Sequence, residues 1–423
     1  MPTSIEKKFI AMAKAVHSGK LTPGQIDQEV TSFVANSLLK GVFTGFNGDF
    51  DTVDYASPDR KMLSYLEKNV FHFSAVKNYH EVVELNNALR DGDRVLTFNE
   101  FKQKAFAIND KYNANYLRAE YNHAVASSQM ARRWVDIQEA KDTHGCLRYD
   151  TAKDDRVRQT HRGLEGVTKP IDDAFWDTWY PPNGWNCRCD VQQVPCSKVT
   201  EDSKIVLPND VPDMFKTNTA KLGMIYPPKH PYWAMPGAMQ KKVFQQFDSF
   251  YNANTEAYYK LTGFPNKSSL EVHGLAYDSD LKHNITNATW WCERVKSLDL
   301  KIRPHFEGKL YQGYKNPELL VDNTHLADFK DAVDVCTHSS LQSHILGGMK
   351  QKCTNLFINI SHPDATPQLV IDAIRGVALN RKNVAKSHIE TYFLRYNENW
   401  IRYTREEALE NNITKLKNLF NQE

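Results

Sequence analysis

Residues 149–189 read YDTAKDDRVRQTHRGLEGVTKPIDDAFWDTWYPPNGWNCRC, which is the densest run of unusual residues in the chain. It holds paired arginines, a histidine, three of the eight tryptophans, a Pro-Pro pair and a Cys-Arg-Cys triplet. Pro-Pro-Asn-Gly is typical of turns, and we expect the tryptophans to pack beneath it. The stretch is therefore predicted to be the rigid centre of one domain. Its characteristic residues are Arg156, Arg158, His161, Trp176, Pro181, Pro182, Cys187, Arg188 and Cys189.

The same stretch offers ligands for a metal ion. Zinc takes four thiolate or imidazole ligands in a tetrahedron, and His161, Cys187 and Cys189 are the candidates. No second Cys-x-x-Cys or His-x-x-x-His pair completes such a set, so the alternative is a loop held by packing and hydrogen bonds. Nucleophilic catalysis by Cys187 with His161 is a weaker alternative, because no third partner is recognisable. The sequence leaves a structural zinc open and predicts no other cofactor.

Composition excludes several classes of protein. At 423 residues the chain suggests two or three domains. A formal charge of +2 indicates no polyanionic partner by itself. No apolar run approaches the roughly 18 residues of a membrane span, and residues 1–20 lack the apolar block of a signal peptide. Seven cysteines, four of them between 146 and 196, favour a reducing compartment and argue against a disulfide framework.

Residues 1–90 are predicted to be helical with loops, and residues 195–240 are predicted to be rich in loops. Thr22, Pro23 and Gln25 resemble a helix start, with a capping hydroxyl, an initial proline and a reciprocal polar side chain. Thr97 and Glu100 form a capping-box pattern, and apolar residues then recur at steps of three and four to about residue 141. A helix of that length would extend about 60 Å, so we expect a break near residues 109–113. Another amphipathic helix is predicted at 237–262.

From about residue 263 the pattern changes to short strands alternating with helices. Segments 318–321 and 326–330 are predicted strands joined by a hairpin turn at 322–325. A helix is predicted at 339–352. Further along, the pattern predicts a strand at 356–360, a helix at 366–379 and strands at 389–395 and 400–403. This part is therefore predicted to be a separate α+β unit.

The central stretch resembles the phage Mu protein F-like head morphogenesis family, whose members are minor capsid proteins of tailed phages. The resemblance covers roughly residues 95–235. It implies a protein packaged in small copy number in the head near the portal, acting in head morphogenesis or genome delivery. The residues that carry it are Tyr149, Asp155-Arg156-Val157-Arg158, His161, Leu164, Gly166, Pro170-Ile171-Asp172-Asp173, Phe175-Trp176, Pro181-Pro182-Asn183-Gly184 and Cys187-Arg188-Cys189, with 116–122, Phe215, Gly223 and His230-Pro231-Tyr232 around them.

This resemblance also implies partners and a location. The partners would be the portal and other capsid proteins, with phage DNA as a further candidate and no membrane. The protein would lie in the virion, in the capsid interior or near the portal, and in the bacterial host cytoplasm during assembly. It implies no catalytic role for the central stretch.

Polar residues around 328–350 are the candidates for catalysis. Asp328 and Lys330 share one face of a predicted strand, since strand side chains alternate. With Ser340 and Lys350 they would suit metal-independent RNA cleavage, in which acid and base groups move protons and a lysine stabilises the phosphorane. The same Asp-x-Lys would serve a metal-dependent nuclease, but no convincing further carboxylates precede it. The alternative is a solvated strand beside a lysine-rich helix.

Residues 265–405 resemble the C-terminal ribonuclease domains of contact-dependent inhibition toxins, of the barnase/EndoU/colicin/RelE-like group. This implies an effector that cleaves host RNA as an alternative to a purely structural role. Glu318 departs from the usual aspartate and Asn323 from the usual turn glycine. The matching residues are Val272-His273, Asp280, Asn284, Ala288, Lys315-Asn316-Pro317-Glu318, Ala327-Asp328-Phe329-Lys330, Ser340 and Lys350-Gln351.

Together these patterns predict a multidomain α+β protein, in which a long-helix N-terminal and Mu F-like module is followed by a small α+β nuclease-like domain. The predicted segments are a helical N-terminal region at 1–92, the Mu F-like domain at 93–236, a helical linker at 237–264, the nuclease-toxin-like domain at 265–410 and a tail at 411–423.

Overall fold

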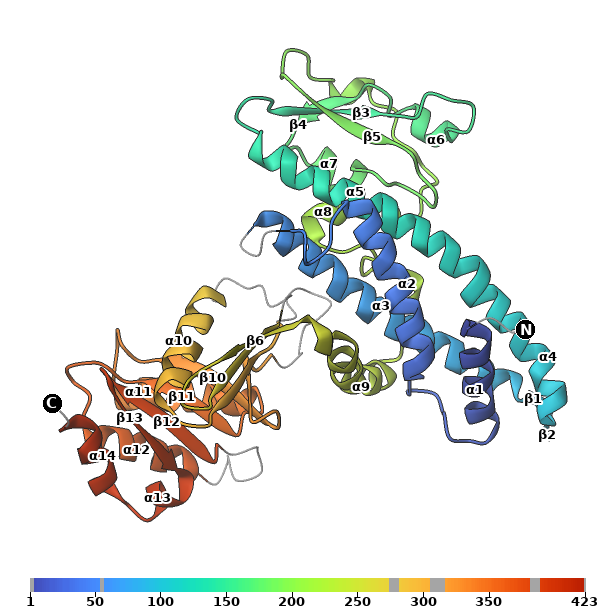
Figure 1. Cartoon of the computed structure of the whole chain (residues 1–423). Helices are drawn as coiled ribbons and strands as arrows, with labels where there is room; N and C mark the ends of the chain where they lie inside the picture. Colours follow the sequence, from blue (N-terminus) through green and yellow to red (C-terminus); the bar gives the residue numbers. More distant parts are fainter. Residues whose placement is uncertain (1–3, 54–56, 274–280, 305–315, 381–388, 422–423) are drawn as a thin grey trace. The chain divides into compact units, whose positions relative to one another are not determined.

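The computed structural model describes residues 4–53, 57–273, 281–304, 316–380 and 389–421. The chain divides into two compact units, Met1–Ala257 and Tyr258–Glu423, and each is described by itself (Figure 1). The first is mainly helical and the second is built on one large sheet, which confirms the predicted multidomain α+β class. Two residues quoted for the toxin resemblance, Asp280 and Lys315, lie outside the described residues.

The unit boundary differs from the predicted segments. Segments 1–92 and 93–236 both belong to the first unit. The predicted linker at 237–264 is divided, because helix α9 (Gly237–Thr255) packs against α3 in the first unit and strand β6 (Tyr259–Gly263) begins the sheet of the second. The predicted tail at 411–423 is part of the second unit, since Leu416 and Leu419 are buried in its core.

Helix α3 (Pro58–Ala88) is the centre of the first unit. It begins after Ser57, whose side chain accepts a hydrogen bond from the Arg60 amide, and it packs against α2, α4, α5 and α9. Because neighbours surround it, it buries residues around its whole circumference. The other helical segments are α1 (Ser4–His17), α2 (Gln28–Phe46), α4 (Phe98–Asn109), the π-helix η1 (Asp110–Tyr116), α5 (Leu117–Glu139), α6 (Gln159–Arg162), α7 (Phe175–Trp179), η2 (Asp202–Lys204), η3 (Asp213–Phe215), α8 (Thr219–Leu222) and η4 (Pro231–Trp233).

Many of the residues that α3 buries are polar, and several of them are paired with neighbouring segments of the first unit. Lys77 Nζ lies 2.5 Å from Glu120 Oε2 on α5 and donates to the Tyr112 carbonyl at 2.9 Å, with both side chains of the ion pair almost fully buried. Asn69 exchanges two hydrogen bonds with the backbone of Tyr226, at 2.8 and 3.1 Å. Buried polar groups need such partners, so α3 is positioned by specific contacts as well as by apolar packing.

Three predictions about helix starts and breaks have different outcomes. The Thr97–Glu100 capping box is present and α4 begins at Phe98. The predicted break appears as a change from α to π geometry over Asp110–Tyr116, without an interruption of the helix. The helix start at Thr22 is wrong: Thr22 does pair with Gln25, but Gly24 has a φ of +96°, which an α-helix does not admit. Helix α2 begins at Gln28, capped by Asp27.

A small antiparallel sheet carries the central stretch of the sequence. Strand β3 (Cys146–Asp150) lies in the middle, between β4 (Thr168–Pro170) and β5 (Asp190–Val194). Cys146 stands opposite Pro170 on one side and Val194 on the other. A separate two-stranded hairpin joins β1 (Arg90–Asp91) to β2 (Arg94–Val95).

The described residues of the second unit form one mixed sheet of eight strands in the order β13-β12-β11-β10-β9-β8-β7-β6. Strands β10, β11 and β12 are parallel, whereas β9 is antiparallel to both its neighbours. The short helix η5 (Glu256–Tyr258) crosses the boundary between the units in the sequence. The other elements of the second unit are β7 (Ser269–His273), α10 (Leu281–Arg294), β8 (Asp299–Ile302), β9 (Leu319–Val321), β10 (His325–Asp331), α11 (His338–Lys350), β11 (Asn355–Asn359), α12 (Pro367–Ala378), β12 (Thr391–Tyr396), β13 (Asn399–Thr404), α13 (Arg405–Leu409) and α14 (Ile413–Phe420).

Helices cover both faces of this sheet. On one face Leu356 and Ile358 of β11 pack into a core with α11, α12 and α14. On the other face Phe357 stacks on Phe393, 4.4 Å between ring centroids, and Trp291 of α10 contacts both rings. The predicted hairpin is confirmed, because β9 and β10 pair in antiparallel register around a turn at residues 322–324. No helix in the described part of the chain is both long and apolar enough to cross a membrane.

Candidate functional site

The Pro-Pro-Asn-Gly turn is tied to the small sheet by buried hydrogen bonds. The Tyr149 hydroxyl, at the end of β3, donates to Asn183 Oδ1 at 3.1 Å. The Asn183 amide in turn donates to the Phe215 carbonyl at 2.9 Å and to the Thr178 carbonyl at 3.2 Å. The Pro181-Pro182 peptide bond is cis. Asn183 therefore connects strand β3, helix α7 and the short helix η3.

Aromatic rings pack below this turn. Trp176 is fully buried and its Nε1 donates to the Lys169 carbonyl at 3.4 Å. Tyr180 packs against Trp134 of α5, 4.9 Å between centroids, and its hydroxyl donates to the Met130 carbonyl at 2.9 Å. These contacts join the sheet module, meaning the three-stranded sheet β3–β5 with its connecting segments (residues 146–196), to helix α5. The aromatic residues therefore serve packing.

His161, Cys187 and Cys189 come together beside the sheet. His161 lies on α6, whereas the cysteines directly precede β5. His161 Nδ1 is 3.4 Å from Cys189 Sγ and 3.7 Å from Cys187 Sγ, and the three donor atoms lie within 4.8 Å of one another. His161 and Cys187 are only 2% and 6% exposed, and neither cysteine is in a disulfide. These are the residues that the sequence offers as zinc ligands.

The two thiols have very different proton affinities. A hydrogen bond from Cys189, together with His161, lowers the pKa of Cys187 far below that of an ordinary thiol, although burial opposes this shift. The Cys187 sulfur and burial raise the pKa of Cys189 in return. The pair therefore carries a single thiolate readily, and a thiolate is the form that nucleophiles and metal ligands require.

The three arginines of the motif surround this cluster in different ways. Arg188 forms a bidentate pair with Asp154, with both N–O distances 2.7 Å. Arg158 donates to the Trp185 carbonyl at 2.5 Å. Arg156 is exposed and lies 3.8 Å from Asp154. Together with the cluster they line a pocket of about 20 Å³, which is room for about one water-sized particle and too little for an organic substrate.

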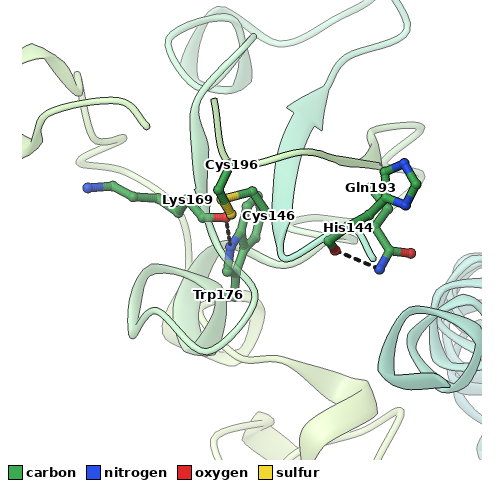
Figure 2. The surroundings of a disulfide bond; sticks show 6 residues. All are labelled: His144, Cys146, Lys169, Trp176, Gln193 and Cys196. Atoms are coloured by element: carbon green, nitrogen blue, oxygen red, sulfur yellow. Dashed lines mark hydrogen bonds between the residues drawn. A yellow bond between two sulfur atoms is a disulfide. The ribbon is translucent and has the colours of Figure 1, made fainter. Parts of the chain in front are cut away.

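A disulfide closes the sheet module, which corrects the expectation from the cysteine count. Cys146 at the start of β3 is bonded to Cys196, two residues beyond β5, with a Cα–Cα distance of 5.1 Å (Figure 2). The antiparallel register of β3 and β5 brings the two cysteines into bonding range. Figure 2 also shows Trp176 below the bond and Gln193, whose amide donates to the His144 carbonyl at 2.8 Å. The cysteine count alone does not predict that Cys146 and Cys196 are paired.

In the second unit, Asp328 and Lys330 lie together with Glu318, which was not among the predicted catalytic residues. Lys330 Nζ is 2.5 Å from Asp328 Oδ2, and Asp328 is 3% exposed. Glu318 lies opposite Asp328, one position beyond the last β9–β10 pair, and its Oε2 accepts from the Phe329 amide at 3.2 Å. Burial and the nearby Asp328 charge raise the pKa of Glu318 well above its ordinary value.

Ser340 and Lys350 are not brought into this group. Ser340 is the third residue of the α11 capping box, where its hydroxyl donates to the Val335 and Thr337 carbonyls. The Lys330 side chain instead approaches α11 near Gly347, about 10 Å along the helix axis from Ser340. Lys350 ends the helix one turn beyond Gly347 and is exposed. Ser340 therefore has a capping role in the structure.

Sequence reasoning missed Glu318 as a neighbour of Asp328, and it missed Arg303 as a neighbour of Glu318. Glu318 was noted only as a departure from a family pattern. The predicted turn at 322–325 would have set Glu318 opposite Phe329, whereas the observed turn at 322–324 sets it opposite Asp328, a difference of one residue in register. Arg303 follows β8 and its amide donates to the Glu318 carbonyl at 2.9 Å, a contact between strands that no local pattern predicts.

Comparisons with known proteins concern the first unit. The family model described as "Phage Mu protein F like protein" matches residues 82–192. Protein F of Escherichia phage Mu, which its name describes as a proposed capsid assembly protein, is 35% identical over 81 residues, covering 19% of this chain and 18% of that protein. The FluMu F protein of a Mu-like prophage in Haemophilus influenzae is 40% identical over 62 residues, 15% of each chain. No solved structure matches.

These matches are specific but short. The chain spans less than a fifth of the length of either relative. The family model ends at residue 192, before Phe215, Gly223 and His230, and it does not reach the second unit. The matched segment includes the last part of α3, the long α4–α5 helix and the whole of 149–189. Residues 82–192 of this chain are therefore similar to the Phage Mu protein F-like family.

Proposed function

We propose that this chain acts in phage head assembly as a minor capsid protein. The observation that carries the proposal is the match of residues 82–192 to the Mu F-like family, together with the name of its phage Mu relative. The fold supports a structural role, because motif residues such as Tyr149, Asn183 and Trp176 are used in buried hydrogen bonds and ring packing, and a disulfide closes the sheet just outside the motif. The pocket beside them is too small for an organic substrate.

The finer assignment rests on the family resemblance. In this proposal the chain is present in few copies in the capsid interior, near the portal, and contributes to genome delivery. Its partners are the portal and other capsid proteins, with phage DNA as a candidate. During assembly it acts in the host cytoplasm.

Analysis of purified particles tests the head-assembly proposal. We expect mass spectrometry to detect peptides of this chain in proheads and virions, at far lower abundance than the major capsid protein. A chain ending at residue 257, which keeps the whole first unit, should still be incorporated when it replaces the full chain. Complete absence of the chain from both kinds of particle would contradict the proposal.

A second candidate function for the second unit is cleavage of RNA, which would make the protein an effector carried in the head. The observation that favours it is the group formed by Glu318, Asp328 and Lys330. A carboxyl group with a raised pKa beside one paired with a lysine is the arrangement of a general acid next to a general base. Lys330 would stabilise the charge of the phosphorane.

The same two carboxylates also suit a divalent cation. Mg²⁺ is bound in proteins through one or two carboxylates together with substrate phosphate. Bound here, the ion would polarise the phosphate and activate water. Glu318 and Asp328 would hold it, and Lys330 would orient the scissile phosphate.

Cleavage assays with the full chain test this second function. Wild type should cleave single-stranded RNA or transfer RNA, and Asp328→Asn or Glu318→Gln should reduce the rate by about 10²–10⁴-fold. Asp364→Asn is a matched control, because Asp364 is an exposed carboxylate of the same unit. Loss of activity in EDTA, restored by Mg²⁺, would assign the cation mechanism; activity that persists in EDTA would assign the metal-independent one. Intact RNA with wild type in both conditions would exclude the function.

A further inference from the structure

We propose that His161, Cys187 and Cys189 bind one thiophilic divalent cation, with zinc as the natural occupant. The proposal is independent of the roles in head assembly and RNA cleavage, because it rests only on the positions of these three side chains. Among the described residues, this is the one group of at least three histidine, cysteine or acidic side chains whose donor atoms converge as metal ligands do.

The distances between donor atoms fit a tetrahedral ion. Zinc lies about 2.3 Å from thiolate sulfur and about 2.0–2.1 Å from imidazole nitrogen. At a tetrahedral angle these bond lengths place nitrogen and sulfur about 3.6 Å apart and two sulfurs about 3.8 Å apart. The observed nitrogen–sulfur distances are 3.4 and 3.7 Å, and all three atoms lie within 4.8 Å of one another. The two nitrogen–sulfur distances therefore match those of a tetrahedral zinc ion to within about 0.2 Å, and the sulfur–sulfur distance is at most 4.8 Å.

The fold aims these donors from two parts of the chain. His161 comes from α6, 26 and 28 residues before the two cysteines. Asn186 has a φ of +54°, a left-handed conformation that asparagine tolerates and that turns the chain into the Cys-Arg-Cys segment. Arg188 between the cysteines is held outward by its bidentate pair with Asp154. Both sulfurs therefore remain on the side of His161.

The donor set indicates the class of metal. Two thiolates and an imidazole favour zinc over Mg²⁺ or Ca²⁺, which take oxygen ligands. The site provides three ligands, and the adjoining pocket of about 20 Å³ has room for one water-sized fourth ligand. Three protein ligands and one water give the open type of zinc site rather than the closed four-ligand type.

Nearby charges are compatible with a neutral metal centre. Two thiolates balance a divalent cation, so the occupied site would carry no net charge. Arg188 is neutralised by Asp154, while Arg158 is held at the Trp185 carbonyl and lies beside the His161 ring. A bound cation would also fix the segment between α6 and β5, because its ligands come from both ends of that segment.

Metal analysis of the full chain tests the site. We expect protein purified anaerobically without added reductant, so that the Cys146–Cys196 bond stays intact, to contain about one equivalent of zinc. After removal of the zinc, titration with Co²⁺ should produce the thiolate-to-cobalt band and the visible absorption of a tetrahedral ion, saturating at one equivalent. Cys189→Ser should weaken binding by more than about 100-fold, since even changes behind the ligands cost 10–100-fold. Cys292→Ser is the matched control, because that buried thiol lies in the second unit.

Three results would overturn the proposal. One is folded wild type that contains no zinc and gives no cobalt band. Another is Cys189→Ser that binds cobalt as tightly as wild type with the same spectrum. If Cys189→Ser does not fold, thiol labelling of wild type decides. Wild type with bound zinc should have two fewer reactive thiols than metal-free wild type. An unchanged number of reactive thiols is the third.

Discussion

Lys77→Met is expected to destabilise the first unit by about 3–5 kcal/mol, the cost of leaving one member of a buried ion pair without its partner. Lys77 and Glu120 are almost fully buried, with Nζ and Oε2 2.5 Å apart. Methionine retains most of the volume but leaves the Glu120 carboxylate without its cation. Hydrogen exchange of peptides from α3 and α5 measures the loss locally, so that unfolding of the second unit does not contribute.

The double variant Lys77→Met, Glu120→Gln is the control. Glutamine removes the charge while keeping the shape, so we expect it to recover most of the lost stability. A double variant no more stable than Lys77→Met would show that the packing of the lysine, and not its charge, is what matters.

The Lys77→Met deficit should also depend on pH. Burial raises the pKa of Glu120, and Lys77 opposes that shift, so its removal raises the pKa further. When folding raises the pKa of an acid, the acid contributes stability at pH values below its pKa in the unfolded chain. That contribution is lost as the pH rises through its pKa in the folded protein. The variant should therefore be closer to wild type near pH 5 than near pH 8. Burial raises the pKa of Glu81 to about 7 and Lys77 opposes that shift as well, so the removal of Lys77 raises the pKa of Glu81 further and adds to the same pH dependence. An equal deficit at both pH values would contradict this account.

Removal of the Cys146–Cys196 disulfide is expected to destabilise the sheet module by about 4 kcal/mol. The bond closes a loop with a sequence separation of 50 residues. The chain-entropy relation for a loop of that length gives about 4 kcal/mol at 25 °C. Replacing both cysteines by serine should therefore lower the protection of β3 and β5 amides from hydrogen exchange, while peptides from the second unit stay unchanged.

Reductant provides the matched control for this second prediction. A phosphine reductant should weaken wild type as much as the double serine variant, and it should have no further effect on the variant. Equal protection of β3 in oxidised wild type, reduced wild type and variant would contradict the prediction.

Local patterns were sufficient wherever the deciding contacts lie within a few residues. The Thr97–Glu100 capping box and the β9–β10 hairpin formed as predicted because their hydrogen bonds are local. The helix start predicted at Thr22 was wrong for a local reason, because Gly24, two residues later, has a left-handed backbone conformation. The residue order of 149–189 was enough to indicate the Mu F-like family, because so many uncommon residues recur in one sequence.

The candidate sites depended on contacts between distant residues. Glu318 and Asp328 meet only because β9 pairs with β10 in one register, and a slip of one residue would place them on opposite faces. Lys77 and Glu120 are 43 residues apart and are paired because α3 is enclosed by other helices. Charged residues on a helix usually lie on its solvent-exposed face. The burial of Lys77 and Glu120 was therefore not predictable from their residue types.

For the central stretch, the sequence by itself determined which residues are unusual and which family they indicate. Only the tertiary structure decided what those residues do. Antiparallel pairing of β3 with β5 joins Cys146 to Cys196 and leaves Cys187 and Cys189 free beside His161. The physical reason is that disulfides and metal sites require particular distances between side chains, and those distances arise from strand register and helix packing rather than from composition.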